Sequence, residues 1–404
     1  MNSGDTAFML VATAMVMLMT PGLALFYGGM VRSKNVLSTT MQSFFCLGLV
    51  SIIWVIYGYS MAFGPDIGGF VGGLKYLGLR GVTTGIGPYS DTIPDLLFCA
   101  FQLMFAIITP ALITGAYAER MKFTAFMLFT VLWSTFVYFP VCHWVWGGGW
   151  LGAMGALDFA GGTVIHLNSG AAALVACIVL GKRKGYGREA MHPHNLPMTI
   201  LGAGVLWFGW FGFNAGSALS AGPIAVLALF TTQVATGAGA ISWVLAEWKV
   251  QGKPTTLGAA SGAVAGLVAI TPGAGFVGPL SAIVIGLVGG GLCYFAVLMK
   301  GRLGYDDALD VVGVHGVGGL WGALATGLFA SVAWNPDGAN GLFFGNPYQF
   351  VVQGIGAGAA IVYSVILTFI ILKVTDALIG LRPDLEEEVQ GMDVSDHKEV
   401  GYSM

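Results

Sequence analysis

The segment Asp158-Phe159-Ala160-Gly161-Gly162-Thr163-Val164-Ile165-His166 starts with a carboxylate and ends, eight residues later, with a histidine inside an apolar run. The same spacing recurs between Asp307 and His315, again with the histidine among apolar residues. An ionisable side chain in such surroundings is unfavourable unless it faces a partner or a pathway. Two histidines in matching frames therefore predict one shared site.

The amino-acid composition indicates a membrane protein. Hydrophobic residues make up 56% of the 404 and charged residues only 9%, against about 25% charged residues in an ordinary soluble domain. We predict an all-α polytopic membrane protein with eleven transmembrane helices, because eleven apolar runs contain no Asp, Glu, Lys or Arg. The runs cover residues 8–30, 36–63, 96–117, 123–145, 159–180, 196–213, 224–246, 257–270, 277–299, 311–333 and 350–372. The eighth is short of the ~20 residues that a span needs.

The basic residues predict how the chain crosses the bilayer. Every Lys and Arg except Lys75 and Arg80 lies in alternate connections between the runs or after the last run. Since cytoplasmic loops carry the excess of basic residues, the N-terminus is expected outside the cell and the C-terminus inside. The first run follows Asp5 rather than a basic segment, so we expect a retained helix and not a cleaved signal peptide.

This topology turns the repeated spacing into an inverted repeat. Residues 1–372 are expected to form a single domain, with inverted repeats at about 8–180 and 196–333, an added eleventh helix at 350–372, and a cytoplasmic tail at 373–404. Eight residues of helix rise about 12 Å, which brings His166 and His315 from opposite faces close to the middle of a ~30 Å hydrocarbon core. Inverted repeats with a midplane site are typical of transport proteins.

Glycine and cysteine usage indicates a closely packed interior. The 63 glycines include the run Gly258-x3-Gly262-x3-Gly266, and small residues at helical spacing let spans pack backbone to backbone. The five cysteines all fall within the apolar runs, without the spacing of a metal site or a disulfide framework. We therefore expect a narrow conduit, no metal and no cofactor. The net charge of −3 does not indicate a nucleic-acid partner.

Aromatic residues gather at the span ends that are expected to face outward. Phe101 and Phe105 are four residues apart and so share one face of the third span. Two further segments, 144–149 and 207–217, place aromatic residues at the outer ends of spans four and six. Such residues more often form an interfacial belt than a binding site. Their position above the two histidines favours a binding site.

Several motifs are similar to those of the Amt/Rh/Mep ammonium transporter family, and specifically of its prokaryotic Amt branch. The matching stretches extend over nearly the whole chain and are Pro21-Gly22, Phe26-Tyr27-Gly28-Gly29, Ala118-Glu119-Arg120, the Asp158-to-His166 segment, Gly209-Trp210-Phe211-Gly212-Phe213-Asn214, Gly313-Val314-His315-Gly316 and Gly391-Met392-Asp393. The last departs from the family's common Gly-Leu-Asp by a conservative change. The resemblance implies ammonium transport across the plasma membrane for nitrogen uptake, and not an enzyme.

The resemblance also implies roles for individual residues. Trp146, Phe105 and Ser217 would recruit ammonium at the outer mouth. Phe105 and Phe213 would be stacked as a gate, and His166 and His315 would line the lumen as a hydrogen-bonded pair. The supporting residues would be Phe101, Asp158, Trp210 and Asn214. A homotrimer with one pore per subunit is implied, as is a PII-type signalling protein that binds the cytoplasmic face.

Residue chemistry favours passage of the neutral molecule. An indole or phenyl face attracts a small cation by about 0.5–2 kcal/mol, whereas carrying a cation through a dry pore meets a penalty of order tens of kcal/mol. Loss of a proton from an amine requires only about 3–4 kcal/mol at neutral pH. A neutral imidazole offers one donor and one acceptor, so a histidine pair can bind ammonia and relay a proton.

Other interpretations of the polar residues stay open. The two histidines could serve only as hydrogen bonds between helices, and Asp158 could cap helix amides instead of handling a proton. Asp307 and Asp310 are expected to be caps. The residues expected to be interfacial or solvated are His143, His192, His194 and the run Glu386-Glu387-Glu388.

Two other functions remain alternatives. An Rh-like channel for ammonia and carbon dioxide is the nearer one. A b-type membrane cytochrome could use two facing histidines as haem ligands, although glycine-rich spans argue against the wide cavity that haem needs. A K⁺ or Na⁺ channel would require rings of carbonyls or carboxylates, which are not visible in the sequence.

Overall fold

The structure is a computed structural model that describes residues 1–402, and it is mostly helical. Within these residues ten helices are long and apolar enough to cross a membrane. A shorter apolar helix, α11 (Thr256–Ile270), lies at the position of the eighth predicted run. The apolar helices therefore define a multi-pass membrane protein.

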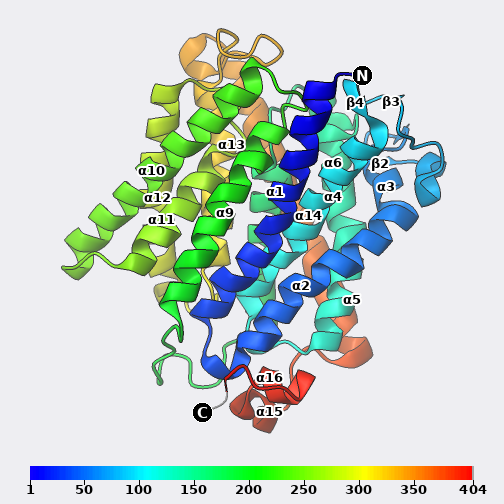
Figure 1. Cartoon of the computed structure of the whole chain (residues 1–404). Coiled ribbons are helices and arrows are strands. Elements are labelled where there is room, and N and C mark those ends of the chain that lie inside the picture. Colours follow the sequence, from blue (N-terminus) through cyan, green and yellow to red (C-terminus); the bar gives the residue numbers. More distant parts are fainter. Residues whose placement is uncertain (403–404) are drawn as a thin grey trace.

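The long segments run side by side through the bundle (Figure 1). Their bounds are α1 (Ser3–Met30); α2, η2 and α3 (Val36–Ile53, Trp54–Gly58 and Tyr59–Phe63); α4 (Asp95–Tyr117); α5, η4 and α6 (Phe123–Trp133, Ser134–Tyr138 and Phe139–Trp146); η5 and α8 (Gly162–Leu167 and Asn168–Leu180); α9 (Leu196–Gly216); α10 (Pro223–Gln251); α11; α12 (Pro279–Leu303); η6 and α13 (Val312–Val317 and Gly318–Phe329); and α14 (Pro347–Ile379).

Short elements lie at both ends of the bundle. They are η1 (Ser33–Asn35), β1 (Asp66–Ile67), β2 (Val71–Gly72), η3 (Leu74–Leu79), β3 (Ile86–Gly87), β4 (Ser90–Pro94), α7 (Trp150–Ala153), η7 (Leu342–Phe344), α15 (Leu385–Gln390) and α16 (Met392–His397). The strands form two antiparallel pairs, β1 with β2 and β3 with β4. They lie at the end where the N-terminus is found, whereas α15 and α16 lie at the opposite end (Figure 1). We call these the N-terminal end and the tail end.

Several helices differ in length from the predicted runs. α10 continues to Gln251, α12 to Leu303 and α14 to Ile379, past the first charged residue in each case. The prediction ended spans at the first charge, but backbone hydrogen bonds let a helix continue beyond the apolar stretch. The fifth span is shorter at its start, because its helix begins only at Gly162.

Glycines allow α10 and α11 to pack closely. A Cβ added at Gly262 would lie 2.5 Å from the Cβ of Trp243, and one at Gly266 would lie 2.5 Å from the Ala235 carbonyl oxygen. A side chain at either position would push the helices apart. The close packing predicted for residues 258–266 is confirmed.

Both histidines lie on π-helical turns, a feature that the sequence did not predict. His166 is in η5 and His315 is in η6, each followed directly by an α-helix. The two segments pack closely through two glycines. A Cβ added at Gly170 in α8 would lie only 2.2 Å from the Cα of Gly316 in η6. Single π-helical turns are frequently found at functional sites.

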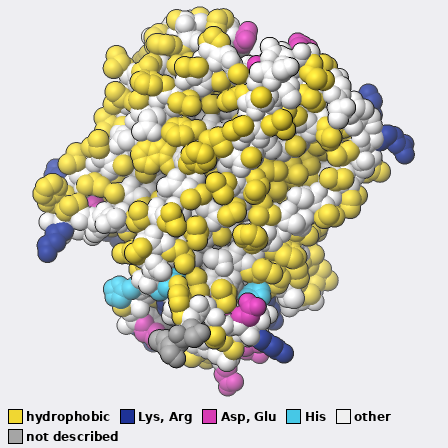
Figure 2. Space-filling view, in the orientation of Figure 1, with side chains coloured by type: hydrophobic (Ala, Val, Ile, Leu, Met, Phe, Trp, Pro, Cys, Tyr) yellow, Lys and Arg dark blue, Asp and Glu magenta, His cyan; other side chains and the backbone are white. Residues whose placement is uncertain are grey.

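The visible surface agrees with a membrane location. Figure 2 shows apolar side chains over the middle of the bundle, with Lys, Arg, Asp and Glu toward its ends. Exposed apolar residues on the long helices include Leu10, Phe208, Leu229 and Ile366. Such a broad apolar surface is what lipid chains would cover.

Candidate functional site

An aromatic cavity opens at the N-terminal end of the bundle. Its volume is about 310 Å³, and we call it the aromatic cavity. The residues that line it are Phe63, Tyr89, Phe98, Gln102, Phe105, Val145, Trp146, Phe159, Ser217 and Leu219. It therefore brings together the three residues assigned by resemblance to recruitment.

Hydrogen bonds fix the orientation of two of these side chains. The Trp146 indole N–H donates to the Asp158 carbonyl oxygen at 2.8 Å, which leaves the ring face, and not the N–H, for a ligand. The Ser217 hydroxyl donates to the Phe213 carbonyl oxygen at 2.9 Å. Because its proton is engaged, the Ser217 oxygen can act toward a ligand only as an acceptor.

Two phenylalanines close the inner end of the aromatic cavity. The Phe105 and Phe213 ring centroids are 4.5 Å apart at an interplanar angle of 83°. The rings meet edge to face, so the expectation that they are stacked is wrong. The Phe101 and Phe105 ring centroids are 4.8 Å apart, also edge to face, so Phe101 packs against the Phe105 ring. Both rings are buried; Phe105 lines the aromatic cavity, whereas Phe213 lines a small inner cavity together with His166 and His315.

The two histidines meet directly behind this constriction. The His166 and His315 Nδ1 atoms are 3.2 Å apart. The His166 ring lies nearly parallel to the His315 ring and to the Trp210 indole, with 5.2 Å between centroids in both cases. Phe213 lies 6.0 Å from His166. The His166 Nε2 atom is buried and has no hydrogen-bond partner within residues 1–402.

Asp158 acts as a cap for the turn that carries His166. Its carboxylate accepts hydrogen bonds of 2.7–3.0 Å from the backbone N–H groups of Gly161, Gly162, Thr163 and Val164. Gly161 has φ +107, a conformation that favours glycine. Since four donors occupy the carboxylate, the geometry supports the capping interpretation. The helix starts after the cap, so the 12 Å depth estimated from eight helical residues does not apply.

The remaining supporting residues tie α9 to its neighbours. The Trp210 indole N–H donates to Thr271 Oγ1 at 2.9 Å, and Asn214 Nδ2 donates to Thr232 Oγ1 at 2.8 Å. These bonds hold the helix that presents Phe213. They engage the Trp210 indole N–H and the Asn214 amide nitrogen, whereas the Asn214 Oδ1 atom is buried without a hydrogen-bond partner within residues 1–402.

On the tail side of the histidines, the two predicted caps behave differently. Asp307 accepts hydrogen bonds from the Val311 and Val312 N–H groups and is a cap as expected. Asp310 instead forms an ion pair with Lys300, so the cap assignment is wrong for its side chain. A small cavity of about 10 Å³ is lined by His315, Asp310, Tyr27 and others and lies along the path to the tail end.

His143 is not interfacial or solvated. It is completely buried, and its ring nitrogens lie 2.9 Å from the Ala62 carbonyl oxygen and 2.9 Å from Asp66 Oδ1. The loop that contains β1 and β2 covers it. The other two histidines expected to be interfacial or solvated are His192 and His194. His192 is exposed, whereas His194 forms hydrogen bonds with the Val31 carbonyl oxygen and the Tyr402 hydroxyl.

A buried ion cluster joins four loops at the tail end, and sequence reasoning missed it. Glu119 pairs with Arg32 at 2.6 Å and with Arg183 at 3.3 Å, and Arg183 pairs with Asp306 at 2.8 Å. Burial alone would raise the pKa of both carboxyls, but bonds and charges from the arginines outweigh it and lower each pKa from its ordinary value. The motif Ala118-Glu119-Arg120 was its only sequence signal.

The tail folds back against these loops. Glu388 is only 3% exposed, pairs with Arg382 and accepts a bond from the Lys184 N–H, so the expected solvated Glu386–Glu388 face is wrong at this residue. The Asp393 carboxylate accepts bonds from the Leu37 and Ser38 N–H groups at the start of α2. The Gly391-Met392-Asp393 motif therefore docks the tail on the bundle.

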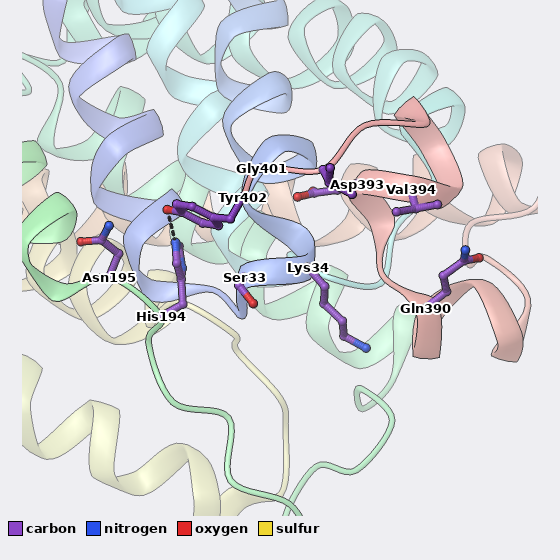
Figure 3. A pocket seen from close by; sticks show the side chains of 10 residues that line it. Ser33, Lys34, His194, Asn195, Gln390, Asp393, Val394, Gly401 and Tyr402 are labelled. Atoms are coloured by element: carbon purple, nitrogen blue, oxygen red, sulfur yellow. Dashed lines mark hydrogen bonds between the residues drawn. The ribbon is translucent and has the colours of Figure 1, made fainter. Parts of the chain in front are cut away.

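A second cavity, of about 760 Å³, lies between the tail and the loops. Figure 3 shows Lys34, His194 and Asp393 around it, with a hydrogen bond between His194 and Tyr402. It lies at the opposite end of the bundle from the aromatic cavity. Within residues 1–402 no group of three or more His, Cys, Asp or Glu side chains is arranged to hold a metal ion.

A helical bundle with a broad apolar surface, a cavity at one end and a buried histidine pair behind it is the architecture of a multi-pass membrane transporter. Residues 7–402 match the model of the Ammonium Transporter Family. The chain belongs to the ammonium transporter family, whose members are transporters and not enzymes.

Individual relatives agree with this assignment. The chain is 54% identical over 403 residues to an ammonium transporter of Bacillus subtilis (strain 168), covering 100% of this chain and 99% of that one. It is 47% identical to ammonium transporter Amt1 of Archaeoglobus fulgidus, covering 100% of both. Among solved structures, Mep2 of Saccharomyces cerevisiae is 38% identical with a TM-score of 0.89, over 96% of this chain and 89% of that one. A sensor Amt protein is 29% identical with a TM-score of 0.90, over 98% of both.

Proposed function

We propose that the protein recruits ammonium in the aromatic cavity, removes a proton, and conducts neutral ammonia past the His166–His315 pair across the plasma membrane. One observation carries this proposal. The histidine pair lies directly behind an aromatic constriction, and the Asp158 carboxylate is already occupied by four backbone N–H groups. The described residues that line the aromatic cavity include no carboxylate that could hold a cation.

Recruitment uses ring faces and one hydroxyl oxygen. The Trp146 ring lies 6.0 Å from the Phe105 ring, and both line the aromatic cavity with Ser217. A cation over such faces gains about 0.5–2 kcal/mol, and the Ser217 oxygen can accept one of its N–H bonds. Ammonium is thus concentrated at the entrance without a carboxylate that would hold it there.

A comparison of the free energies of desolvation and deprotonation favours loss of the proton at the Phe105–Phe213 constriction. Moving a charged group from water into apolar surroundings without a partner is unfavourable by tens of kcal/mol in a low dielectric. Deprotonating ammonium near pH 7 requires only about 3–4 kcal/mol. The neutral molecule is therefore the species that crosses the constriction.

The histidine pair suits ammonia because the two rings share one proton. When both rings are neutral, one Nδ1 donates to the other across the 3.2 Å separation. The Nε2 atoms then differ, one being an acceptor and the other a donor. Ammonia, which both donates and accepts, can bond to either ring along the path.

The histidine geometry does not support the cytochrome alternative. With 3.2 Å between the Nδ1 atoms there is no space for a haem macrocycle between the rings. Similarity to known proteins bears on the Rh-like alternative. The identity of 47–54% to named ammonium transporters favours ammonium transport over it.

The proposal extends to topology and assembly. We propose eleven spans, with α11 as the eighth, in one domain of residues 1–372 built as an inverted repeat, with the N-terminus outside and the tail of residues 373–404 in the cytoplasm. The N-terminal and tail ends lie at opposite ends of the bundle, as an odd number of spans requires (Figure 1). A homotrimer and a PII-type protein docked at the tail end are also proposed, on the basis of family resemblance.

Reconstituted protein provides the test. Ammonium uptake and membrane current are measured together in liposomes that contain the purified protein, with empty liposomes as the control. We expect saturable, ammonium-dependent uptake that K⁺ does not reproduce. Uptake no greater than in empty liposomes, or an equal response to K⁺, would contradict the proposed function.

A further inference from the structure

Gln102 is the one amide side chain among the residues that line the aromatic cavity. It lies on α4 between Phe98 and Phe105, which are four residues before and three residues after it. Residues with this spacing share one helix face. Gln102 is 8% exposed and therefore reaches the cavity from a largely buried position.

The Gln102 carboxamide oxygen, unlike that of the buried Gln353, forms no hydrogen bond with the described residues of the protein. Its Oε1 atom is buried and has no hydrogen-bond partner within residues 1–402. In contrast, the Gln353 carboxamide accepts from the Leu157 N–H and donates to the carbonyl oxygens of Leu157 and Ala323. A buried polar atom without a partner is unfavourable, so such an atom beside a cavity suggests that a ligand completes its hydrogen bonding.

We propose that Gln102 is a further substrate-binding residue, whose amide oxygen accepts one N–H bond of the ammonium ion in the aromatic cavity. This inference rests on the proposed function. Ammonium has four N–H donors, and Ser217 supplies an acceptor for only one of them. The Asp158 carboxylate is occupied by backbone amides. Gln102 supplies a second acceptor that is neutral, so it binds the cation without trapping it.

The chemistry of the side chain permits this role. The oxygen and the nitrogen of a carboxamide exchange places by a half-turn about the Cγ–Cδ bond, so the oxygen can face the cavity. A hydrogen bond to a charged group contributes more than one between neutral groups. Binding of the cation therefore stabilises the orientation in which the oxygen faces it.

The variant Gln102→Leu removes the acceptor and keeps the approximate volume. In reconstituted liposomes we expect the half-saturating ammonium concentration to rise about tenfold, because one charge-assisted hydrogen bond is lost. The maximal rate should change by less than about twofold, since the constriction and the histidine pair are intact. Gln42→Leu is the matched control. Gln42 is 3% exposed with an Oε1 atom that also lacks a partner, but it lies on α2 and does not line the aromatic cavity.

A structural role for Gln102 makes different predictions. It would lower the melting temperature of Gln102→Leu and reduce the maximal rate, whereas we expect a melting temperature no lower than that of the unsubstituted protein. If the unsubstituted protein transports ammonium and Gln102→Leu keeps its half-saturating concentration, the inference is wrong while the proposed function stands. If the unsubstituted protein does not transport ammonium, the proposed function itself fails.

A second variant covers the case in which Gln102→Leu does not fold. Gln102→Glu keeps the shape and the acceptor oxygen and adds a negative charge. We expect it to lower the half-saturating ammonium concentration, because the acceptor becomes stronger. An unchanged or raised value in folded Gln102→Glu would overturn the assignment.

Discussion

Replacing His166 with Asp tests whether the neutral histidine pair excludes cations. An aspartate oxygen is attached to Cγ as Nδ1 is in histidine, so it reaches the position that now lies 3.2 Å from His315 Nδ1. The substitution therefore puts a carboxylate in the path without enlarging the side chain. We expect the variant to hold a cation where the unsubstituted protein holds a neutral molecule.

The expected effect is large enough to measure. Two opposite unit charges 4 Å apart interact by about 4 kcal/mol at an effective dielectric constant near 20. This corresponds to about a thousandfold in an equilibrium constant. K⁺ should then cross the His166→Asp variant, and ammonium should cross as the ion, with a higher ratio of current to uptake.

The assay compares K⁺ and ammonium currents in liposomes, with His166→Asn as the matched control. Asparagine has the shape of aspartate without its charge, so His166→Asn should remain impermeable to K⁺. Suppose that His166→Asp folds and moves ammonium, excludes K⁺ and keeps the original ratio of current to uptake. Selectivity would then depend on another element, most directly the Phe105–Phe213 constriction, and the histidine argument would be refuted.

Three further predictions concern the gate, the assembly and the ion cluster. Phe213→Ala should raise the leak of other small cations without loss of folding, since Phe105 and Trp210 remain; unchanged selectivity in a flux assay would count against the gate. Native mass spectrometry in mild detergent should give trimers, and monomers or dimers alone would refute the proposed assembly. Because the folded-state pKa values of Glu119 and Asp306 are lowered, their stabilisation is complete above the ordinary carboxyl pKa of about 4 and is lost as the pH falls through the lowered values. Melting temperatures should therefore drop below about pH 4, and less so in Arg183→Met; equal pH profiles for the two proteins would contradict this.

The sequence alone determined which stretches form the long apolar helices and which two histidines form a pair. Hydropathy is a local property, so the apolar runs coincide with the long helices and with α11. The Asp-x7-His spacing singled out His166 and His315, which lie in contact although 149 positions separate them. The Gly258–Gly266 pattern indicated close helix packing because a missing side chain is itself a sequence feature.

The tertiary structure decided the orientation and the environment of the polar and aromatic groups. The angle between Phe105 and Phe213 depends on packing by Phe101 and neighbouring helices, which hydropathy does not encode. His143 is buried because a loop centred on Asp66 folds over it. In both cases part of the environment comes from other helices or loops, since Phe213 lies on α9 and Asp66 lies on β1.

The same reason explains what sequence reasoning missed. The partners of Glu119 are distant in the chain, at Arg32 and Arg183, and Glu388 is buried only because the tail returns to the loops. Gln102 gave no signal, because an unpaired amide is recognised only when its surroundings are known. The free energy of transferring apolar side chains out of water is roughly proportional to their area, so it can be summed along the sequence and predicts the apolar helices locally. Burial and pairing of polar groups depend on contacts between distant segments, and only the folded chain determines them.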